Sequence, residues 1–390
     1  MMIDFKDYFD PVSIESPDFK LIADQSGFPH NITVHTQNLS FKDLNKYKIA
    51  LLGVPDGRNS SGTGTKKGPD QIRGELYKLA RIPGKCKIID LGNMKCGITF
   101  NDTIRGLSDI LSCLIGNDIF PIVIGGSSAL VLAFDKAFSE LKIRYTMISV
   151  DPRIDYINEK KEPDSFNYLN TITHNHKSYF CHFINLGFQT YLNDQQVINR
   201  FLKQKSELMR IGDVRKNIHL TEPLFRDSDV AVFDISAVRQ SDAPGTICPS
   251  PNGFYGEEIC LLARYAGISD NMKTFGLFDV DPDLDSRNQT AGLAAQIIWF
   301  FLESFSQKQF ETPALSNISS GRFIRYHVRV SDLDDDLVFV KSSLTDRWWM
   351  EFRNNADNTL YISCSHEDYL KANRNEVPER WIIAAERLKS

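Results

Sequence analysis

Long apolar segments alternate with segments of helical spacing along residues 47–305. The apolar segments lie at 47–55, 87–92, 120–126, 144–151, 181–189, 229–236 and 273–281. Strands that are apolar along their whole length are typical of a parallel sheet covered by helices on both faces. The pattern therefore predicts an α/β domain. In such domains the functional site lies beyond the carboxyl ends of the strands.

The pattern changes after residue 305. Short segments with turn signals between them predict antiparallel strands, and a helix is expected at the end of the chain, at 377–390. The four predicted strands are 323–330, 336–343, 347–353 and 359–365. We therefore divide the chain into an N-terminal extension (1–47), an α/β domain (48–305) and a β-rich C-terminal extension with a final helix (306–390).

Composition narrows the class of protein. The net charge is −5 and the sequence pI is about 5.9, which argues against a nucleic-acid binder that depends on a strong positive field. The seven cysteines include no C-x-x-C pair, and the N-terminus lacks the apolar core of a signal peptide. The longest apolar stretch, 294–302, is far shorter than the ~20 residues that span a bilayer. We expect a cytoplasmic protein that binds neither membrane nor nucleic acid.

Three motifs are too incomplete to predict a site. The G-x-G at 62–64 is followed by Lys66 and Lys67, but it has neither the P-loop nor the dinucleotide spacing. Ser127 and Ser128 follow a glycine pair without the nucleophile-elbow pattern or a recognisable base. The remaining motif is a histidine group without carboxylates or thiols at ligand spacing, formed by His174, His176 and His182.

Aspartates at strand ends are the strongest chemical signal. Asp151 and Asp155 follow the segment that ends at 151, and Asp234 belongs to the segment 229–236. Asp279 and Asp281 close the segment 273–281. Acids brought to one edge of a sheet can form a site for a hard cation. Aspartates in these positions also commonly cap turns and helices, so both interpretations remain open.

A series of motifs resembles the ureohydrolase family of arginase, agmatinase and formimidoylglutamase. The motifs are G-V-P (53–55), G-P-x-x-I-R (68–73), P-I-V-I-G-G (121–126), S-V-D-x-x-x-D (149–155), A-P-G-T (243–246), D-x-D-P-x-L-D (279–285) and T-A-G-L-A (290–294). The resemblance implies a three-layer α/β/α arginase-like fold with a central parallel sheet. It also implies homo-oligomers and a two-manganese site that activates hydroxide against a guanidino or formimidoyl carbon.

Several positions that the resemblance assigns to the metal site depart from the family pattern. Asp151, Asp155 and Asp234 match metal-ligand aspartates, whereas Ser128 and Arg153 stand where the family has histidines, and Ser236 stands where it has an aspartate. Asp279 stands where the family has the glutamate that holds the amidino group. Leu169 or Asn170 falls nearest to the family's acid/base histidine.

Arg153 could compensate for the missing metal. Two unit charges ~4 Å apart interact by about 4 kcal/mol at an effective dielectric near 20, so converging carboxylates need a cation. A guanidinium offers a fork of donors that matches carboxylates. We therefore expect Arg153 to replace an ion and to tie Asp151 to Asp234.

Three functions follow, and the first is our main hypothesis. The chain has lost dimanganese hydrolase activity, needs no cofactor, and serves a binding or scaffold role as a homo-oligomer or with a protein partner on its β-rich extension. The first alternative is a divergent hydrolase of linear amidines, with manganese held by Asp151, Asp155 and Asp234 together with Ser128. The second is a small-molecule sensor that keeps the amidino pocket without the chemistry.

Overall fold

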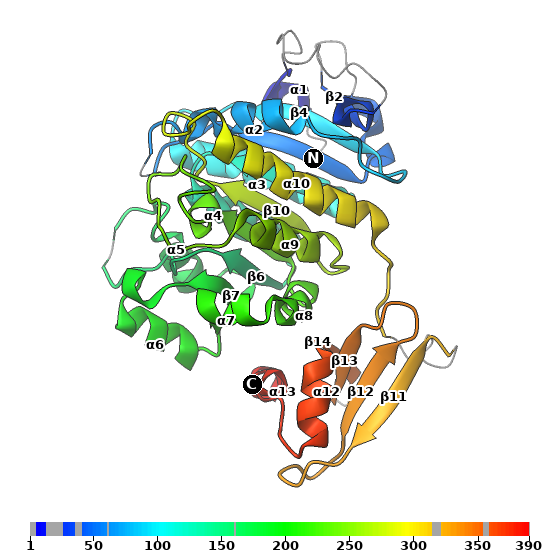
Figure 1. Cartoon of the computed structure of the whole chain (residues 1–390). Helices are drawn as coiled ribbons and strands as arrows, with labels where there is room; N and C mark the ends of the chain where they lie inside the picture. The colour runs from blue at the N-terminus through cyan, green and yellow to red at the C-terminus, as the bar shows by residue number, and fades with distance from the viewer. Residues whose placement is uncertain are drawn as a thin grey trace.

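The central element is a mostly parallel ten-stranded sheet in the order β1-β4-β3-β5-β10-β9-β6-β7-β8, with β2 also paired to β4 (Figure 1). The computed structural model describes residues 5–12, 26–35, 41–60, 62–159, 161–313, 321–353 and 359–389. The strands are β1 (Phe9–Asp10), β2 (Ile32–Val34), β3 (Ile49–Val54), β4 (Ile88–Met94), β5 (Phe120–Gly125), β6 (Tyr145–Val150), β7 (Phe180–Phe188), β8 (Glu207–Arg210), β9 (Val230–Asp234) and β10 (Thr274–Phe278). Only β1 pairs antiparallel, so the predicted parallel sheet is confirmed.

Helices cover both faces of this sheet. They are α1 (Phe5–Tyr8), α2 (Gly68–Leu76), α3 (Phe100–Gly116), α4 (Val131–Leu141), α5 (Tyr168–His174), α6 (Gln195–Lys203), α7 (Ile211–Lys216), α8 (Glu222–Arg226), α9 (Gly256–Gly267) and α10 (Gln289–Gln307). Leu51 and Ile122 share one apolar core with α2, α9 and α10, and their neighbours Leu52 and Val123 share the other with α3 and α4. Because successive residues of a strand face opposite sides of the sheet, each central strand is buried on both of its faces. The predicted three-layer α/β/α fold is therefore confirmed.

The N-terminal extension adds to the same sheet. β2 pairs parallel to β4, and β1 pairs antiparallel to it through Phe9 and Met94. Phe9 is fully buried in the core that contains α3. The described part of residues 1–47 therefore forms one margin of the main sheet.

The C-terminal extension forms a second, antiparallel sheet in the order β11-β12-β13-β14. Its strands are β11 (Phe323–Val328), β12 (Leu337–Ser342), β13 (Trp348–Arg353) and β14 (Thr359–Cys364), followed by the helices α12 (His366–Asn373) and α13 (Glu379–Lys389). Phe339, Trp348 and Met350 pack against Tyr369 of α12 and Trp381 of α13. The predicted strands are confirmed, but α12 was not expected. Ser365 and Asp368 form a capping box at its start.

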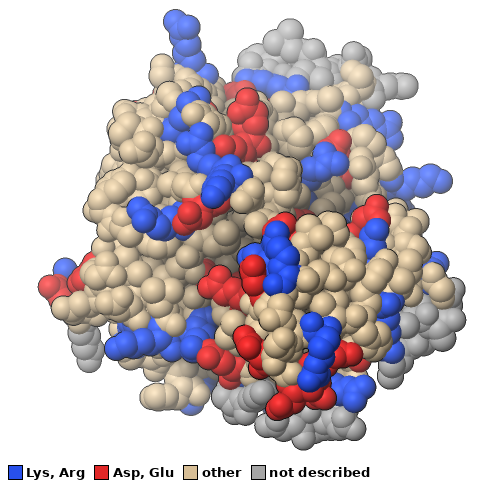
Figure 2. All heavy atoms as spheres, turned by 60° about the horizontal axis from the view of Figure 1, so that its bottom comes forward, with Lys and Arg blue, Asp and Glu red and all other residues tan. Residues whose placement is uncertain are grey.

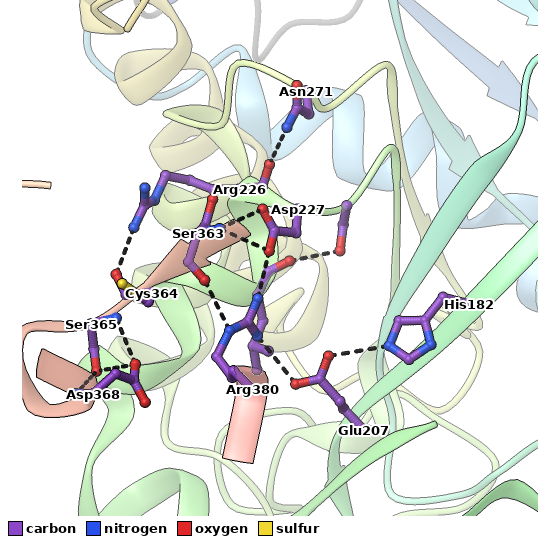
Figure 3. Close-up of polar contacts among 12 residues, drawn as sticks. His182, Glu207, Arg226, Asp227, Asn271, Ser363, Cys364, Ser365, Asp368 and Arg380 are labelled. Carbon is purple, nitrogen blue, oxygen red and sulfur yellow. Dashed lines mark hydrogen bonds and ion pairs between the residues drawn. The ribbon is translucent and has the colours of Figure 1, made fainter. Parts of the chain in front are cut away.

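The C-terminal sheet is docked on the main domain by charged side chains (Figure 3). Arg380 of α13 contacts Glu207, at the start of β8, at 3.1 Å and Asp227, just before β9, at 2.6 Å. The Asp227 carboxylate accepts the Ser363 N–H of β14, and Arg226 donates to the carbonyl of Cys364. These main-domain residues precede or begin their strands. The C-terminal sheet therefore lies at the amino-terminal edge of the main sheet.

The surface, the helices and the cysteines add three observations. Lys and Arg side chains are interspersed with Asp and Glu on the face seen in Figure 2, which brings the bottom of Figure 1 forward. In the described ranges, no helix combines the length and the apolar character needed to cross a membrane. All seven cysteines are free thiols.

Candidate functional site

Four aspartates converge at the carboxyl-terminal edge of the main sheet. Asp151 follows β6, Asp234 ends β9, Asp279 follows β10, and Asp155 lies four residues beyond Asp151. Their exposed fractions are 2%, 8%, 8% and 3%, respectively. We call these residues the four-aspartate cluster. The predicted gathering of acids at one sheet edge is thus present, on the side opposite the docked C-terminal sheet.

Burial and mutual repulsion dominate the electrostatics of this cluster. Burial, followed by the charge of Asp155, raises the pKa of Asp151 well above its usual value. Burial raises the pKa of Asp155 and Asp234 in the same way, with added repulsion from Asp234 and Asp151, respectively, and burial also raises the pKa of Asp279. The ion pairs found in the described part of the chain include none of these carboxylates. The cluster therefore needs bound protons or a cation at neutral pH.

Hydrogen bonds from the main chain fix three of the four carboxylates. Asp151 accepts from the Arg153 N–H at 2.6 Å, and Asp234 accepts from the Ser236 N–H at 2.7 Å. Such bonds are typical of aspartates that cap turns. Asp151 and Asp234 therefore cap turns and also belong to the four-aspartate cluster.

Asp155 and Asp279 differ in their partners. Asp279 accepts from the Ser60 hydroxyl at 2.9 Å and from the Ser128 N–H at 3.0 Å. The Asp155 Oδ2 atom is buried without a hydrogen-bond partner. A buried carboxylate oxygen without a partner is costly, which makes it the atom in this cluster most available to a bound cation.

The expectation that Arg153 ties Asp151 to Asp234 is wrong. Its guanidinium donates instead to the Leu192 carbonyl at 3.3 Å and lies 5.3 Å from the centre of the Phe166 ring. The main-chain N–H of Arg153 faces Asp151, so the side chain leaves the turn in another direction. Its charge lowers the pKa of Asp151, but it is outweighed by burial and by the charge of Asp155. The guanidinium lines a pocket of about 310 Å³ beside Asn158 and Asn193.

At the other positions that the resemblance assigns to the metal site and to the acid/base histidine, no side chain brings an imidazole to the four-aspartate cluster. Ser128 is buried, and its hydroxyl donates to the Ser165 carbonyl at 3.3 Å. Ser236 is also buried and contributes its main-chain N–H. Leu169 belongs to the apolar core, and the Asn170 amide bonds the main chain of Ile157.

The remaining sequence candidates lie apart from the cluster. His182 pairs with Glu207 at the docking interface, and His174 bonds the Asn170 carbonyl. Asp281 accepts the Gly64 N–H, and a Cβ on Gly64 would lie 1.8 Å from its Oδ1 atom. The glycine-rich loop is therefore packed tightly against Asp281.

Sequence reasoning missed Ser60 and Cys248. Ser60 follows the carboxyl end of β3, so its place at the same sheet edge as the aspartates was a usable signal. Burial raises the pKa of the Cys248 thiol, Arg153 lowers it, and the charges of Asp234 and Asp279 raise it further. Cys248 therefore lies close enough to the cluster to sense its charge, and the A-P-G-T motif just before it is the only hint of this.

The cluster has the donor atoms of a hard-cation site but not the arrangement of one. Its donors are carboxylate oxygens, which suit magnesium, calcium or manganese. In the described ranges, however, no group of three or more His, Cys, Asp or Glu side chains is arranged to hold a metal ion. The side chains of Ser128 and Arg153 add no nitrogen ligand, because serine has none and an arginine stays protonated.

The fold and the comparisons place the chain in a family. A model described as "Arginase family" matches residues 47–303, and the chain belongs to the arginase family. It is similar to the formimidoylglutamase of Bacillus subtilis (strain 168), with 24% identity over 284 residues that cover 67% of this chain and 88% of the relative. The formimidoylglutamase of Staphylococcus haemolyticus is 26% identical over 304 residues, covering 72% and 94%.

Solved structures share the fold. The crystal structure of Trypanosoma cruzi formiminoglutamase with Mn²⁺ has a TM-score of 0.64 at 19% identity, covering 69% of this chain and 97% of that one. The proclavaminate amidino hydrolase from Streptomyces clavuligerus has a TM-score of 0.57 at 19% identity, covering 67% and 93%. The family match ends at residue 303, before the C-terminal sheet begins at Phe323.

Proposed function

We propose that this chain binds a linear amidine or guanidine cation at the four-aspartate cluster and has lost two-manganese hydrolysis. The observation that supports the proposal is the set of four buried carboxylates whose pKa values are all raised and that lack a cationic partner. An amidinium is planar and carries several N–H donors, so it can pair with more than one carboxylate. Binding it would offset the repulsion within the cluster.

The residues around the cluster argue against the family's chemistry. Ser128 and Arg153 occupy positions that correspond to histidine ligands, and Ser236 occupies one that corresponds to an aspartate. Neither Leu169 nor Asn170 can act as a general base. Hydrolysis of an amidine needs an activated water, and no side chain in this set lowers the pKa of water toward neutrality.

The second candidate is a divergent hydrolase of linear amidines, and the unpaired Asp155 Oδ2 atom favours it. The formimidoylglutamase relatives also favour it. Asp151, Asp155 and Asp234 would hold one manganese ion, which when bound supplies an activated water. Asp279 would then hold the amidino group through its second lone pairs.

Binding and turnover can be tested on the same purified protein. We expect agmatine and formamidine to raise the melting temperature, metal analysis to find less than one manganese per chain, and no urea, formamide or ammonia to be released from arginine, agmatine or formimidoylglutamate. Asp155→Asn should abolish the ligand-induced shift. Asp135→Asn is the matched control, because Asp135 is a buried aspartate bonded to Tyr145 at the start of β6, away from the cluster.

The outcomes separate the candidates. Turnover that disappears with chelation and in Asp155→Asn would establish the hydrolase and refute the loss of activity. A wild-type protein that shows neither a ligand-induced shift nor turnover would refute both candidates.

A scaffold role forms a separate part of the proposal. The C-terminal sheet is docked at the amino-terminal edge of the main sheet, so a protein bound to it would lie away from the four-aspartate cluster at the opposite edge. Assembly as a homo-oligomer and a cytoplasmic location stay predictions. Light scattering coupled to gel filtration tests the first of them.

A further inference from the structure

The loop between β3 and α2 brings a hydroxyl group to the four-aspartate cluster. Ser60 donates to Asp279 Oδ1 at 2.9 Å, and the Ser128 N–H donates to Asp279 Oδ2 at 3.0 Å. Each oxygen of Asp279 therefore receives one hydrogen bond from a different segment of the chain. The carboxylate keeps further lone pairs that can accept hydrogen bonds.

Asp279 adopts an unusual backbone conformation. Its φ of 61° lies in the left-handed region, which few residues other than glycine adopt. Such strain persists only where the surroundings over-determine it, and it concentrates at functional sites. The two hydrogen bonds from Ser60 and Ser128 are the contacts that fix the direction of this carboxylate.

Ser60 is itself held firmly in place by its neighbour. The Asn59 carbonyl accepts the Ser127 hydroxyl at 3.1 Å and the Ser165 N–H at 2.9 Å. The Asn59 side chain donates to the Pro163 carbonyl at 2.6 Å. These bonds fasten the loop to two other segments that surround the cluster.

The preceding residue fastens the loop on its other side. Arg58 pairs with Asp56 at 2.6 Å and donates to the Thr103 hydroxyl at 3.0 Å. The two residues that precede Ser60 are thus anchored, and on its following side the Gly62 N–H donates to the Ser60 hydroxyl at 3.2 Å. These contacts hold the Ser60 hydroxyl beside Asp279.

We infer that Ser60 is a positioning residue that aims Asp279 at a planar, two-donor amidinium and disfavours a divalent metal ion. The inference rests on the proposed function. An amidinium presents two N–H groups side by side, which match two carboxylate oxygens of fixed orientation. A hydrogen bond to each oxygen leaves less negative charge for a metal ion, which demands strong oxygen donors. The aspartate at this position would thus select the shape of the cation as well as its charge.

The test compares four variants with the wild type by titration with agmatine and, separately, with Mn²⁺. Ser60→Ala removes the donor, Ser60→Cys keeps the size but donates weakly, and Ser60→Thr keeps the hydroxyl. Ser112→Ala is the matched control, because Ser112 donates to a carboxylate, Glu140, at 3.0 Å on α3 and α4, remote from the cluster. Melting temperatures establish that each variant is folded.

We expect agmatine to bind roughly tenfold more weakly to Ser60→Ala and Ser60→Cys, which is the effect of losing one hydrogen bond to a charged group. Mn²⁺ should bind these two variants as well as, or better than, the wild type. Ser60→Thr should restore agmatine binding, and Ser112→Ala should behave as the wild type. Weaker binding of agmatine without weaker binding of Mn²⁺ is the signature that a merely structural serine would not produce.

Two results would overturn the inference. If the wild type binds agmatine and Ser60→Ala or Ser60→Cys binds it equally well, Ser60 does not position Asp279, although the proposed function stands. If Ser60→Ala, Ser60→Cys and Ser60→Thr all weaken both probes together, the serine is structural. A wild type that does not bind agmatine overturns the proposed function and this inference with it.

Discussion

Arg380 is the residue whose removal tests the docking of the C-terminal sheet most directly. Its guanidinium contacts Glu207 at 3.1 Å, Asp227 at 2.6 Å and the Ser363 carbonyl at 2.9 Å (Figure 3). Its side chain is 13% exposed. Arg380→Ala would therefore leave two carboxylates without their shared cation at the interface.

The size of the effect follows from the electrostatics of Glu207. Burial raises the pKa of Glu207, but the charge of Arg380, followed by the hydrogen bond with His182, lowers it from 4.5 to about 2. Arg380 is therefore the main cation that keeps this buried carboxylate ionised. Asp227 adds to the cost of removing Arg380, because burial keeps the pKa of Asp227 above its usual value even with Arg380 present. Breaking a buried ion pair from one side costs about 3–5 kcal/mol.

Tryptophan emission during urea unfolding provides the assay, because three of the four tryptophans, Trp348, Trp349 and Trp381, lie in the C-terminal unit. The fourth, Trp299, lies in α10 of the main domain. We expect Arg380→Ala to lower the free energy of this transition by about 3 kcal/mol or more. Arg374→Ala is the matched control, because Arg374 pairs with Glu367 at the surface of the same unit with a 57% exposed side chain. Such a surface pair contributes at most about 1 kcal/mol. If the two variants unfold within about 1 kcal/mol of each other, the docking argument fails.

Three further predictions concern stability. Acidification should destabilise the docked C-terminal sheet. Burial lowers the pKa of His182, so its contribution to stability is lost as the pH falls below about 6.5, and the contribution of Glu207 is lost between pH 4.5 and about 2. A tryptophan transition that stayed constant down to pH 4 would contradict this prediction. Asp155→Asn should stabilise the ligand-free protein at pH 7 by at least about 1 kcal/mol, since burial and like charges raise the pKa of this carboxyl, and a lower unfolding midpoint would refute it. Gly64→Ala should cost about 1–3 kcal/mol in thermal unfolding, because the new Cβ would meet Asp281, whereas Gly74→Ala, in open space on α2, should cost nothing.

The carboxylate cluster and the docking interface respond to pH in opposite ways. The raised pKa values of Asp151, Asp155 and Asp234 mean that the folded main domain takes up protons before the unfolded chain does. The repulsion among these carboxylates is therefore relieved as the pH falls toward about 3.8. Acidification instead protonates the neutral imidazole of His182 and the ionised carboxylate of Glu207, the forms that stabilise the docking interface. On acidification, the carboxylate cluster should therefore destabilise the main domain less, while the docking of the C-terminal sheet becomes weaker.

Local signals in the sequence were sufficient to predict the central sheet, its covering helices and the edge at which the aspartates meet. Apolar runs along the whole length of a strand require burial on two faces, so they predicted the parallel sheet and its helical cover. The aspartates at the ends of three such runs had to meet at one edge, because parallel strands point the same way. The Ser365–Asp368 capping box was also readable, and helix α12 was missed because that signal was not weighed.

The direction of individual side chains was decided only by tertiary structure. The sequence placed Arg153 beside Asp151, but the turn in which Asp151 binds the Arg153 N–H sends the guanidinium toward Leu192. Ser60 and Asp279 lie 219 residues apart, so their hydrogen bond exists only once β3 and β10 share a sheet. The docking of Arg380 on Glu207, 173 residues away, depends in the same way on the packing of two separate sheets. Periodicity fixes which face of an element is buried, whereas contacts between distant segments depend on the whole arrangement of elements in space.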